Sequence, residues 1–161
     1  MTNWRAMPAD EAASLAGALH TLDWSWVLDD VPAIVERFDW RISSSRPRRI
    51  RVDTTFSPDS GAFRAKDGQV TGIELRLTDY APAGENTEVA AAFDNVATAI
   101  ITKLGEPTAR VAGPPLQLRW AGPQATLLLV RFDASVWLNL TTNARLAADD
   151  RNIELEEQGL L

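Results

Sequence analysis

The sequence predicts an α+β fold, with one mainly antiparallel sheet of about six strands and helices packed on one face. Apolar residues recur at three- and four-residue steps near the start and in the middle of the chain, whereas most other segments alternate with a period of two. The strands come in runs rather than in a β-α-β series, which favours antiparallel pairing. A length of 161 residues with 45% hydrophobic residues suits a single domain over residues 1–161.

Two helices are expected before the sheet. The first covers about residues 8–22, because a proline opens it and two carboxylates occupy its first turn, at the positive end of the helix dipole. The second is short: Asp30 can cap it, and it ends near Phe38. Trp40 then begins a possible strand, which the serine-rich segment 43–47 is expected to break.

The middle of the chain predicts a strand, a hairpin and the clearest helix. Residues 50–56 alternate between apolar and polar side chains, as a strand with one buried face does. Residues 63–77 form the hairpin, with Asp67-Gly68 as its turn. The helix covers residues 86–104, since a glycine and then a proline follow its last apolar position.

Three more strands are expected at 116–120, 125–132 and 136–140. The apolar run at 127–130 indicates a central strand covered on both faces. From about residue 143 the chain becomes a polar C-terminal tail with room for one short helix or strand.

Composition argues against several classes of function. The chain has no cysteine, so it has no disulfide, thiolate zinc site or cysteine nucleophile. A net charge of -6 disfavours nucleic-acid binding. No apolar run approaches the roughly 20 residues that cross a bilayer, and the N-terminal residues lack the apolar segment of a secretory signal. We therefore expect a cytoplasmic protein that binds neither nucleic acid nor membrane.

The sequence contains no recognisable catalytic, metal or cofactor motif. His20 is the only histidine, and its place near the end of the first helix suits a structural role. There is no G-x-S-x-G motif and no glycine-rich phosphate loop. The acidic pairs at 29–30 and 149–150 do not match a calcium-binding loop. We expect no enzyme, and neither a metal nor a cofactor.

Charge and tryptophan are concentrated in the first third of the chain. Residues 1–40 carry seven acids and two arginines, whereas residues 41–51 carry five arginines and no acid. Within the basic part, residues 46–51 are interpreted as a solvated connection leading into a strand. In the stretch DWSWVLDD, residues 23–30, the two tryptophans point the same way if the backbone is extended. Two interpretations stay open, a piece of core or an interface anchor. The candidate partner-binding residues are Trp24, Trp26, Asp29, Asp30 and Trp40.

Several short segments together resemble a known class of proteins. They are Leu22-Asp23-Trp24-Ser25-Trp26, Phe38-Asp39-Trp40, Gly68-Gln69-Val70, and Leu104-Gly105-Glu106-Pro107 ahead of Trp120. With the order of elements, they resemble uncharacterised actinobacterial α+β proteins, which are similar to the immunity proteins encoded beside secreted polymorphic toxins. The resemblance implies a cytoplasmic antitoxin that binds a cognate toxin domain and blocks its active site, and it carries no functional residue over.

A basic active-site cleft on such a toxin would complement the acidic N-terminal third of the chain. Two alternatives remain. One is a small-molecule binding or sensing domain, with a tryptophan-lined pocket between helices and sheet. The other is a secretion chaperone.

Overall fold

The computed structural model describes residues 4–82, 84 and 86–160, and in them it has eight strands, four α-helices and one short 3-10 helix. The strands are β1 (Arg41–Arg46), β2 (Arg49–Asp53), β3 (Gly61–Lys66), β4 (Gln69–Arg76), β5 (Ala109–Val111), β6 (Leu116–Trp120), β7 (Ala125–Arg131) and β8 (Val136–Thr142). The helices are α1 (Ala9–His20), η1 (Leu28–Asp30), α2 (Val31–Arg37), α3 (Thr87–Leu104) and α4 (Asn143–Glu157).

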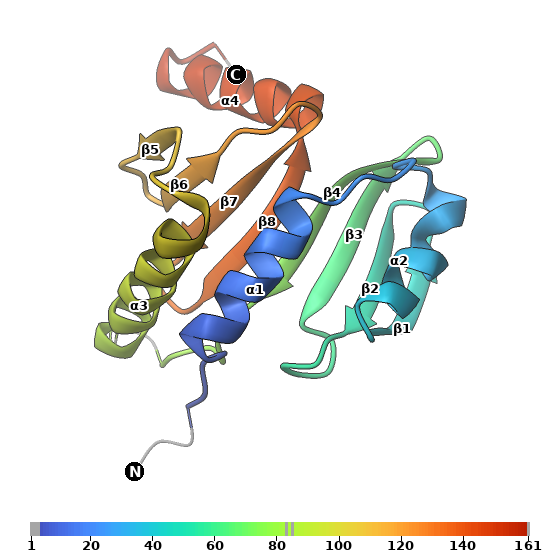
Figure 1. Cartoon of the computed structure of the whole chain (residues 1–161). Helices are drawn as coiled ribbons and strands as arrows, with labels where there is room; N and C mark the ends of the chain where they lie inside the picture. Colours follow the sequence, from blue (N-terminus) through green and yellow to red (C-terminus); the bar gives the residue numbers. More distant parts are fainter. Residues whose placement is uncertain (1–3, 83, 85, 161) are drawn as a thin grey trace.

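All eight strands belong to one sheet, in the order β1-β2-β3-β4-β8-β7-β6-β5, and every neighbouring pair is antiparallel (Figure 1). The predicted α+β class with an antiparallel sheet is confirmed. The expected number of about six strands is too low, because β1 and β5 lack the apolar alternation by which strands are recognised.

The two additional strands lie at the two edges of the sheet. The serine-rich segment was expected to break a strand, but it forms most of β1. β1 pairs with β2, and the register of this pairing shifts between Ile42 and Ser44. β5 has only three residues and pairs with β6. An edge strand needs few apolar side chains, so neither segment shows a buried face in its sequence.

The main core lies between one face of the sheet and the helices α1, α2 and α3. Figure 1 shows α1 and α3 together over the middle of this face, with α2 beside β1. Strand register brings apolar residues from five neighbouring strands into one row: Ile50, Phe63, Ile73, Leu140 and Leu127. Each is at most 5% exposed, and burying such a side chain contributes about 1.5–3 kcal/mol.

The predicted hairpin and long helix are confirmed within a few residues. Asp67 and Gly68 form the turn between β3 and β4 with φ values of 52° and 79°. The helix expected at 86–104 is α3. Asp30 does occupy the position before α2, but its side chain does not cap the helix, contrary to expectation. Its carboxylate instead accepts a hydrogen bond of 2.5 Å from the Ser25 hydroxyl.

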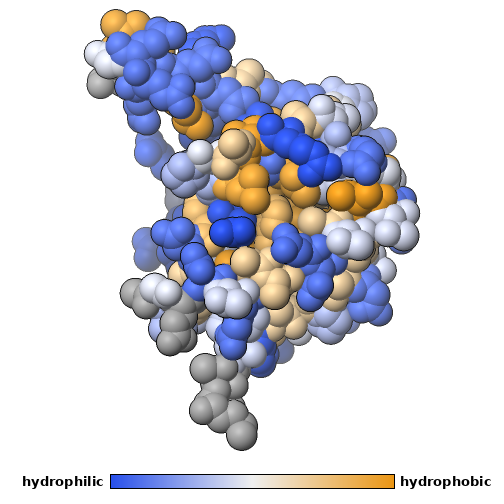
Figure 2. All heavy atoms as spheres, turned by 90° about the vertical axis from the view of Figure 1, so that its left-hand side faces the viewer, coloured by the Kyte–Doolittle hydropathy of each residue, from blue (hydrophilic) through white to orange (hydrophobic). Residues whose placement is uncertain are grey.

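The C-terminal segment, which was expected to be a polar tail with room for one short helix or strand, is a helix of 15 residues. The Thr142 side chain caps α4 by accepting a hydrogen bond from the Arg145 backbone N–H at 3.3 Å. Figure 2 shows α4 as a mostly hydrophilic arm that projects from the body of the protein. Among the described residues, no helix is long and apolar enough to cross a membrane.

The expectation that all helices pack on one face is wrong for α4. Side chains alternate between the two faces of a strand, so Leu128 and Val130 point away from the main core. Both are buried, and both line a groove together with Leu146 of α4. The prediction that the segment 127–130 is covered on both faces is thereby confirmed.

Candidate functional site

The tryptophans expected to bind a partner form an aromatic cluster around Phe63. The Trp24 and Trp26 rings lie 5.1 Å apart at 42°, and the Trp24 and Trp40 rings meet Phe63 edge-on at 6.2 Å and 6.1 Å. Phe38 stacks on Trp40 at 4.7 Å. Because Trp26 is 8% and Trp40 9% exposed, these two rings belong to the core. They lie beneath the surface and pack against the other aromatic rings of the cluster.

Trp24 and the backbone at Trp26 have features that packing alone does not require. Trp24 is half-buried, and its indole Nε1 is buried with no hydrogen-bond partner. Trp26 has a φ of 59°, which is uncommon for a bulky side chain and costs about 1–3 kcal/mol. Two backbone hydrogen bonds hold it there: Val70 N–H to Trp26 C=O at 2.8 Å, and Leu28 N–H to Gly68 C=O at 2.9 Å. The segment is thus fastened to the β3–β4 turn.

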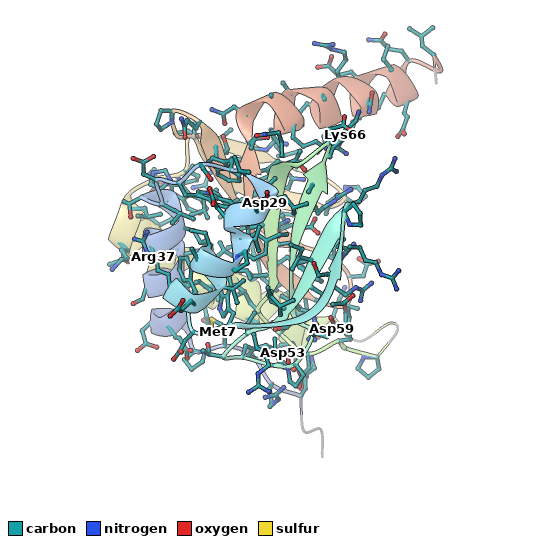
Figure 3. All side chains as sticks on the ribbon, turned by 90° about the vertical axis from the view of Figure 1, so that its right-hand side faces the viewer. Met7, Asp29, Arg37, Asp53, Asp59 and Lys66 are labelled. Atoms are coloured by element: carbon teal, nitrogen blue, oxygen red, sulfur yellow. The ribbon has the colours of Figure 1, made fainter. Side chains whose placement is uncertain are left out.

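Three exposed carboxylates, which we call the acidic rim, lie on the same segment as Trp24 and Trp26: Asp23, Asp29 and Asp30. Figure 3 shows Asp29 at the beginning of α2. No described residue forms an ion pair with any of the three. The Ser25 hydroxyl joins the rim to the backbone, since it donates to Asp30 and accepts from Val27 N–H at 3.2 Å. The rim therefore presents unpaired negative charge on an ordered turn.

A second feature, which the sequence did not indicate, is the groove between α4 and the sheet face opposite the main core. We call it the α4 groove; its cavity has a volume of about 270 Å³. Arg119 closes one side by donating from Nη1 and Nη2 to the Asp150 carboxylate at 2.8 Å and 2.9 Å. Gln117 Oε1 accepts from the same guanidinium at 3.0 Å. These contacts hold α4 against the sheet.

The environment of Asp150 favours its charged form. Hydrogen bonds from Arg119 lower the pKa of the Asp150 carboxyl, and partial burial opposes this effect without cancelling it. At neutral pH the Asp150 carboxyl is therefore ionised. Asn139, further along the groove, has a buried side-chain oxygen Oδ1 with no hydrogen-bond partner.

Positive charge gathers at one end of the α4 groove, which we call the basic end. It is a cavity of about 300 Å³ lined by Arg48, Arg64, Lys66 and Arg145, with Ala65 and Thr71 between them. Arg64, Thr71 and Arg145 line this cavity and the α4 groove alike, so the two are continuous. The interpretation of residues 46–51 as a solvated connection into a strand agrees with the structure in its first part, because Pro47 and Arg48 form the exposed turn between β1 and β2, and β2 begins at Arg49.

The structure brings the predicted partner-binding residues together and places the predicted structural histidine at the end of α1. Trp24, Trp26 and Trp40 meet in one cluster, and Asp29 and Asp30 lie at its edge. His20 is the last residue of α1, as expected, and its Nδ1 is buried without a hydrogen-bond partner. The groove residues come from β3, β4, β6, β7, β8 and α4, so no local motif marks them. The described residues contain no group of three metal-ligating side chains.

Comparison with known proteins bears on the family and not on the activity. No curated protein and no solved structure matches the chain. A family model described as a family of unknown function, DUF6301, matches residues 10–142. The match includes the aromatic cluster, the acidic rim and the strands of the sheet, and it ends where α4 begins. Because the matched residues make up most of its length, the chain belongs to the DUF6301 family.

Proposed function

We propose that this protein is an immunity protein, which binds a cognate toxin domain through the acidic rim and blocks its active site. The observation that carries the proposal is the set of three exposed carboxylates, Asp23, Asp29 and Asp30, which form no ion pair with any described residue and lie on one short ordered segment. A basic active-site cleft is the complementary surface, and charge complementarity of this kind speeds association and selects the partner.

Order in the free protein supports this role. The backbone beside Asp29 is hydrogen-bonded to the β3–β4 turn, and the Asp30 carboxylate is held by Ser25. A surface that is already ordered loses less conformational entropy when a partner binds. Trp26 and Trp40 maintain this order from the core, while the half-exposed Trp24 is positioned to contact the partner directly.

The proposal includes a cytoplasmic location and the absence of catalysis. An inhibitor acts by occupying a surface, so it needs neither a nucleophile nor a cofactor. The net charge of -6 adds a long-range attraction toward a cationic partner, which falls as salt concentration rises.

The proposal is tested by co-expressing the protein with the product of the adjacent gene and measuring both complex formation and rescue of growth. Asp29→Lys is expected to weaken binding at least about tenfold, because it replaces an attraction with a repulsion, and to abolish rescue. Asp94→Lys is the matched control, since Asp94 is exposed on α3 and the change in net charge is the same. If the unaltered protein neither binds nor rescues, the proposal is wrong.

A second candidate function is binding of a small apolar molecule. It is favoured by a cavity of about 280 Å³ between α1 and the β1–β2 end of the sheet, lined in part by Met7, Leu15, Phe38 and Trp40. Ligand pockets are commonly apolar with a few polar groups. One measurement distinguishes the two candidate functions. If the protein binds a small apolar molecule at this cavity, that molecule is expected to change the tryptophan fluorescence and to raise the unfolding temperature of the isolated protein. Toxin inhibition requires no such ligand.

A further inference from the structure

Three arginines lie side by side on the sheet face that carries α4. Strand register places Arg46 opposite Arg49 and Arg49 opposite Arg64, across β1, β2 and β3. Neighbouring strands are about 4.8 Å apart, and like charges directly opposite each other destabilise a sheet. All three side chains are exposed. This row lowers the stability of the free protein, and a bound anion would remove that cost.

The surrounding carboxylates do not neutralise this positive charge. Glu74 lies 3.6 Å from Arg64 and 4.0 Å from Arg49, so one carboxylate serves two guanidinium groups. In the part of the chain that the structure describes, Arg46, Arg48 and Lys66 form no ion pair. Arg145 is paired with Asp149 at 3.0 Å. Arg46, Arg48 and Lys66 thus give this face of an otherwise acidic protein a local excess of cations.

The basic end concentrates part of this charge around a cavity. Arg48 comes from the β1–β2 turn, Arg64 and Lys66 from β3, and Arg145 from the first turn of α4. Figure 3 shows Lys66 close to α4, on the side of the sheet over which that helix projects. Four cationic side chains from three separate segments therefore converge on one cavity, where guanidinium groups can hold oxyanions through paired hydrogen bonds.

The groove that continues from this cavity accepts a different kind of group. Its walls include the apolar side chains of Leu128, Val130 and Leu146. The buried Oδ1 of Asn139 has no partner, so a hydrogen-bond donor on a ligand would satisfy it. A ligand that fits both parts has anionic groups at one end and an N–H donor among apolar contacts at the other.

We propose that the basic end and the α4 groove bind an acidic segment of a partner polypeptide, with its carboxylates at the cationic side chains and a backbone N–H directed toward Asn139. A polypeptide supplies both of the required groups. A nucleic acid fits less well, because the basic end, in its described lining, offers no aromatic ring for stacking.

This site is separate from the acidic rim. The rim adjoins the aromatic cluster that packs on Phe63, whereas Arg64, the next residue of β3, points to the other face. The inference therefore goes beyond the proposed immunity function, and either can fail without the other.

The test measures binding of a fluorescein-labelled peptide of alternating glutamate and alanine by fluorescence anisotropy at low salt. The double variant Arg48→Glu with Lys66→Glu is expected to bind at least about tenfold more weakly, because it removes two charge-assisted contacts. The matched control is Arg37→Glu with Arg110→Glu, which changes the net charge equally at two exposed positions away from the groove (Figure 3 shows Arg37). The control is expected to bind like the unaltered protein.

The neutral variant Arg48→Gln with Lys66→Gln removes the same two positive charges without adding negative ones, in case the double glutamate variant does not fold. Circular dichroism checks that each variant is folded. Equal weakening in the groove variant and in the control would overturn the proposal, since it would indicate general charge attraction. Absence of binding by the unaltered protein at millimolar peptide would also overturn it. Tighter binding of a single-stranded RNA of equal charge, with the same loss in the groove variant, would replace the peptide with a nucleic acid.

Discussion

Arg119 and Asp150 form a two-pronged ion pair that joins the sheet to α4, with Nη1 to Oδ2 and Nη2 to Oδ1 distances of 2.8 Å and 2.9 Å. The Arg119 side chain is 14% exposed and that of Asp150 is 41% exposed. Since α4 has no buried residue, its attachment to the sheet rests mainly on this ion pair and on a few contacts in its first turn. The position of α4, and with it the shape of the groove, depends on a small number of polar contacts.

The docking of α4 is expected to depend on pH. The pKa of Asp150 is lowered in the folded protein, so its contribution to stability is present above the unfolded value of about 3.9 and is lost as the pH falls through the folded value. Amide hydrogen exchange in α4, compared with that in β7, is expected to be constant from pH 7 to pH 5 after correction for intrinsic rates, and to accelerate selectively below about pH 4. Equal acceleration in β7 would show global unfolding and contradict this.

Neighbouring aspartates on α4 are expected to respond differently to substitution. Asp150→Asn weakens the pair with Arg119 by about 1 kcal/mol after solvent screening, which corresponds to a roughly fivefold larger population of the form in which α4 is detached. Asp149→Asn is the control, because among the described residues Asp149 pairs with Arg145 alone, four residues away, at 3.0 Å on an exposed surface. Limited proteolysis of the C-terminal segment distinguishes the two, and equal rates would exclude a special role for Asp150.

Substitutions in the aromatic cluster are expected to lower the free energy of unfolding, whereas substitutions in the acidic rim are expected to leave it nearly unchanged. Phe63→Ala and Trp40→Ala remove buried rings and are expected to lower the free energy of unfolding by about 3–5 kcal/mol each. Asp29→Ala changes an exposed side chain and is expected to alter it by less than about 0.5 kcal/mol. Urea denaturation checks both values. If Trp40→Ala left stability unchanged, Trp40 would not be a core residue.

Two glycines of the sheet make a matched test of packing. A Cβ on Gly61 would lie 2.8 Å from Val52 Cγ2 and 3.0 Å from Leu75 Cδ2, whereas a Cβ on Gly72 has no neighbour closer than 3.6 Å. Gly61→Ala is therefore expected to destabilise the protein by about 1–3 kcal/mol through overpacking. Gly72→Ala is expected to have little effect, and thermal unfolding compares the two. A similar loss in both would show that the loss comes from the strand backbone and not from packing.

Much of the fold follows from local patterns, and some of it does not. The helix α3 and the β3–β4 hairpin were predicted because an apolar stripe and an Asp-Gly turn are local signals. The strand β5 was missed and β1 was expected to be broken by its serines, because edge strands bury little. The C-terminal segment was expected to hold at most one short helix or strand, because no apolar stripe distinguishes α4. The correct strand count required knowledge of which segments pair.

The candidate site divides in the same way. Asp29 and Asp30 are adjacent in the chain, so the sequence alone indicated local negative charge beside two tryptophans. Whether those rings are core or surface was open until the structure buried Trp26 against Trp24 and left Trp24, which meets Phe63 edge-on, half-exposed. The basic end could not be predicted, because Arg48, Arg64 and Arg145 are far apart in the chain and meet only after β1 to β4 and β8 have paired.

By itself the sequence determined the fold class, the main helices, most strands and the separation of acidic from basic segments, since each depends on residues close together in the chain. Only the tertiary structure decided which face of the sheet each segment covers, that α4 lies opposite the other helices, and that Arg46, Arg49 and Arg64 stand in one row. Strand register determines these features, because it brings side chains from distant segments together and fixes the face of the sheet on which each side chain lies.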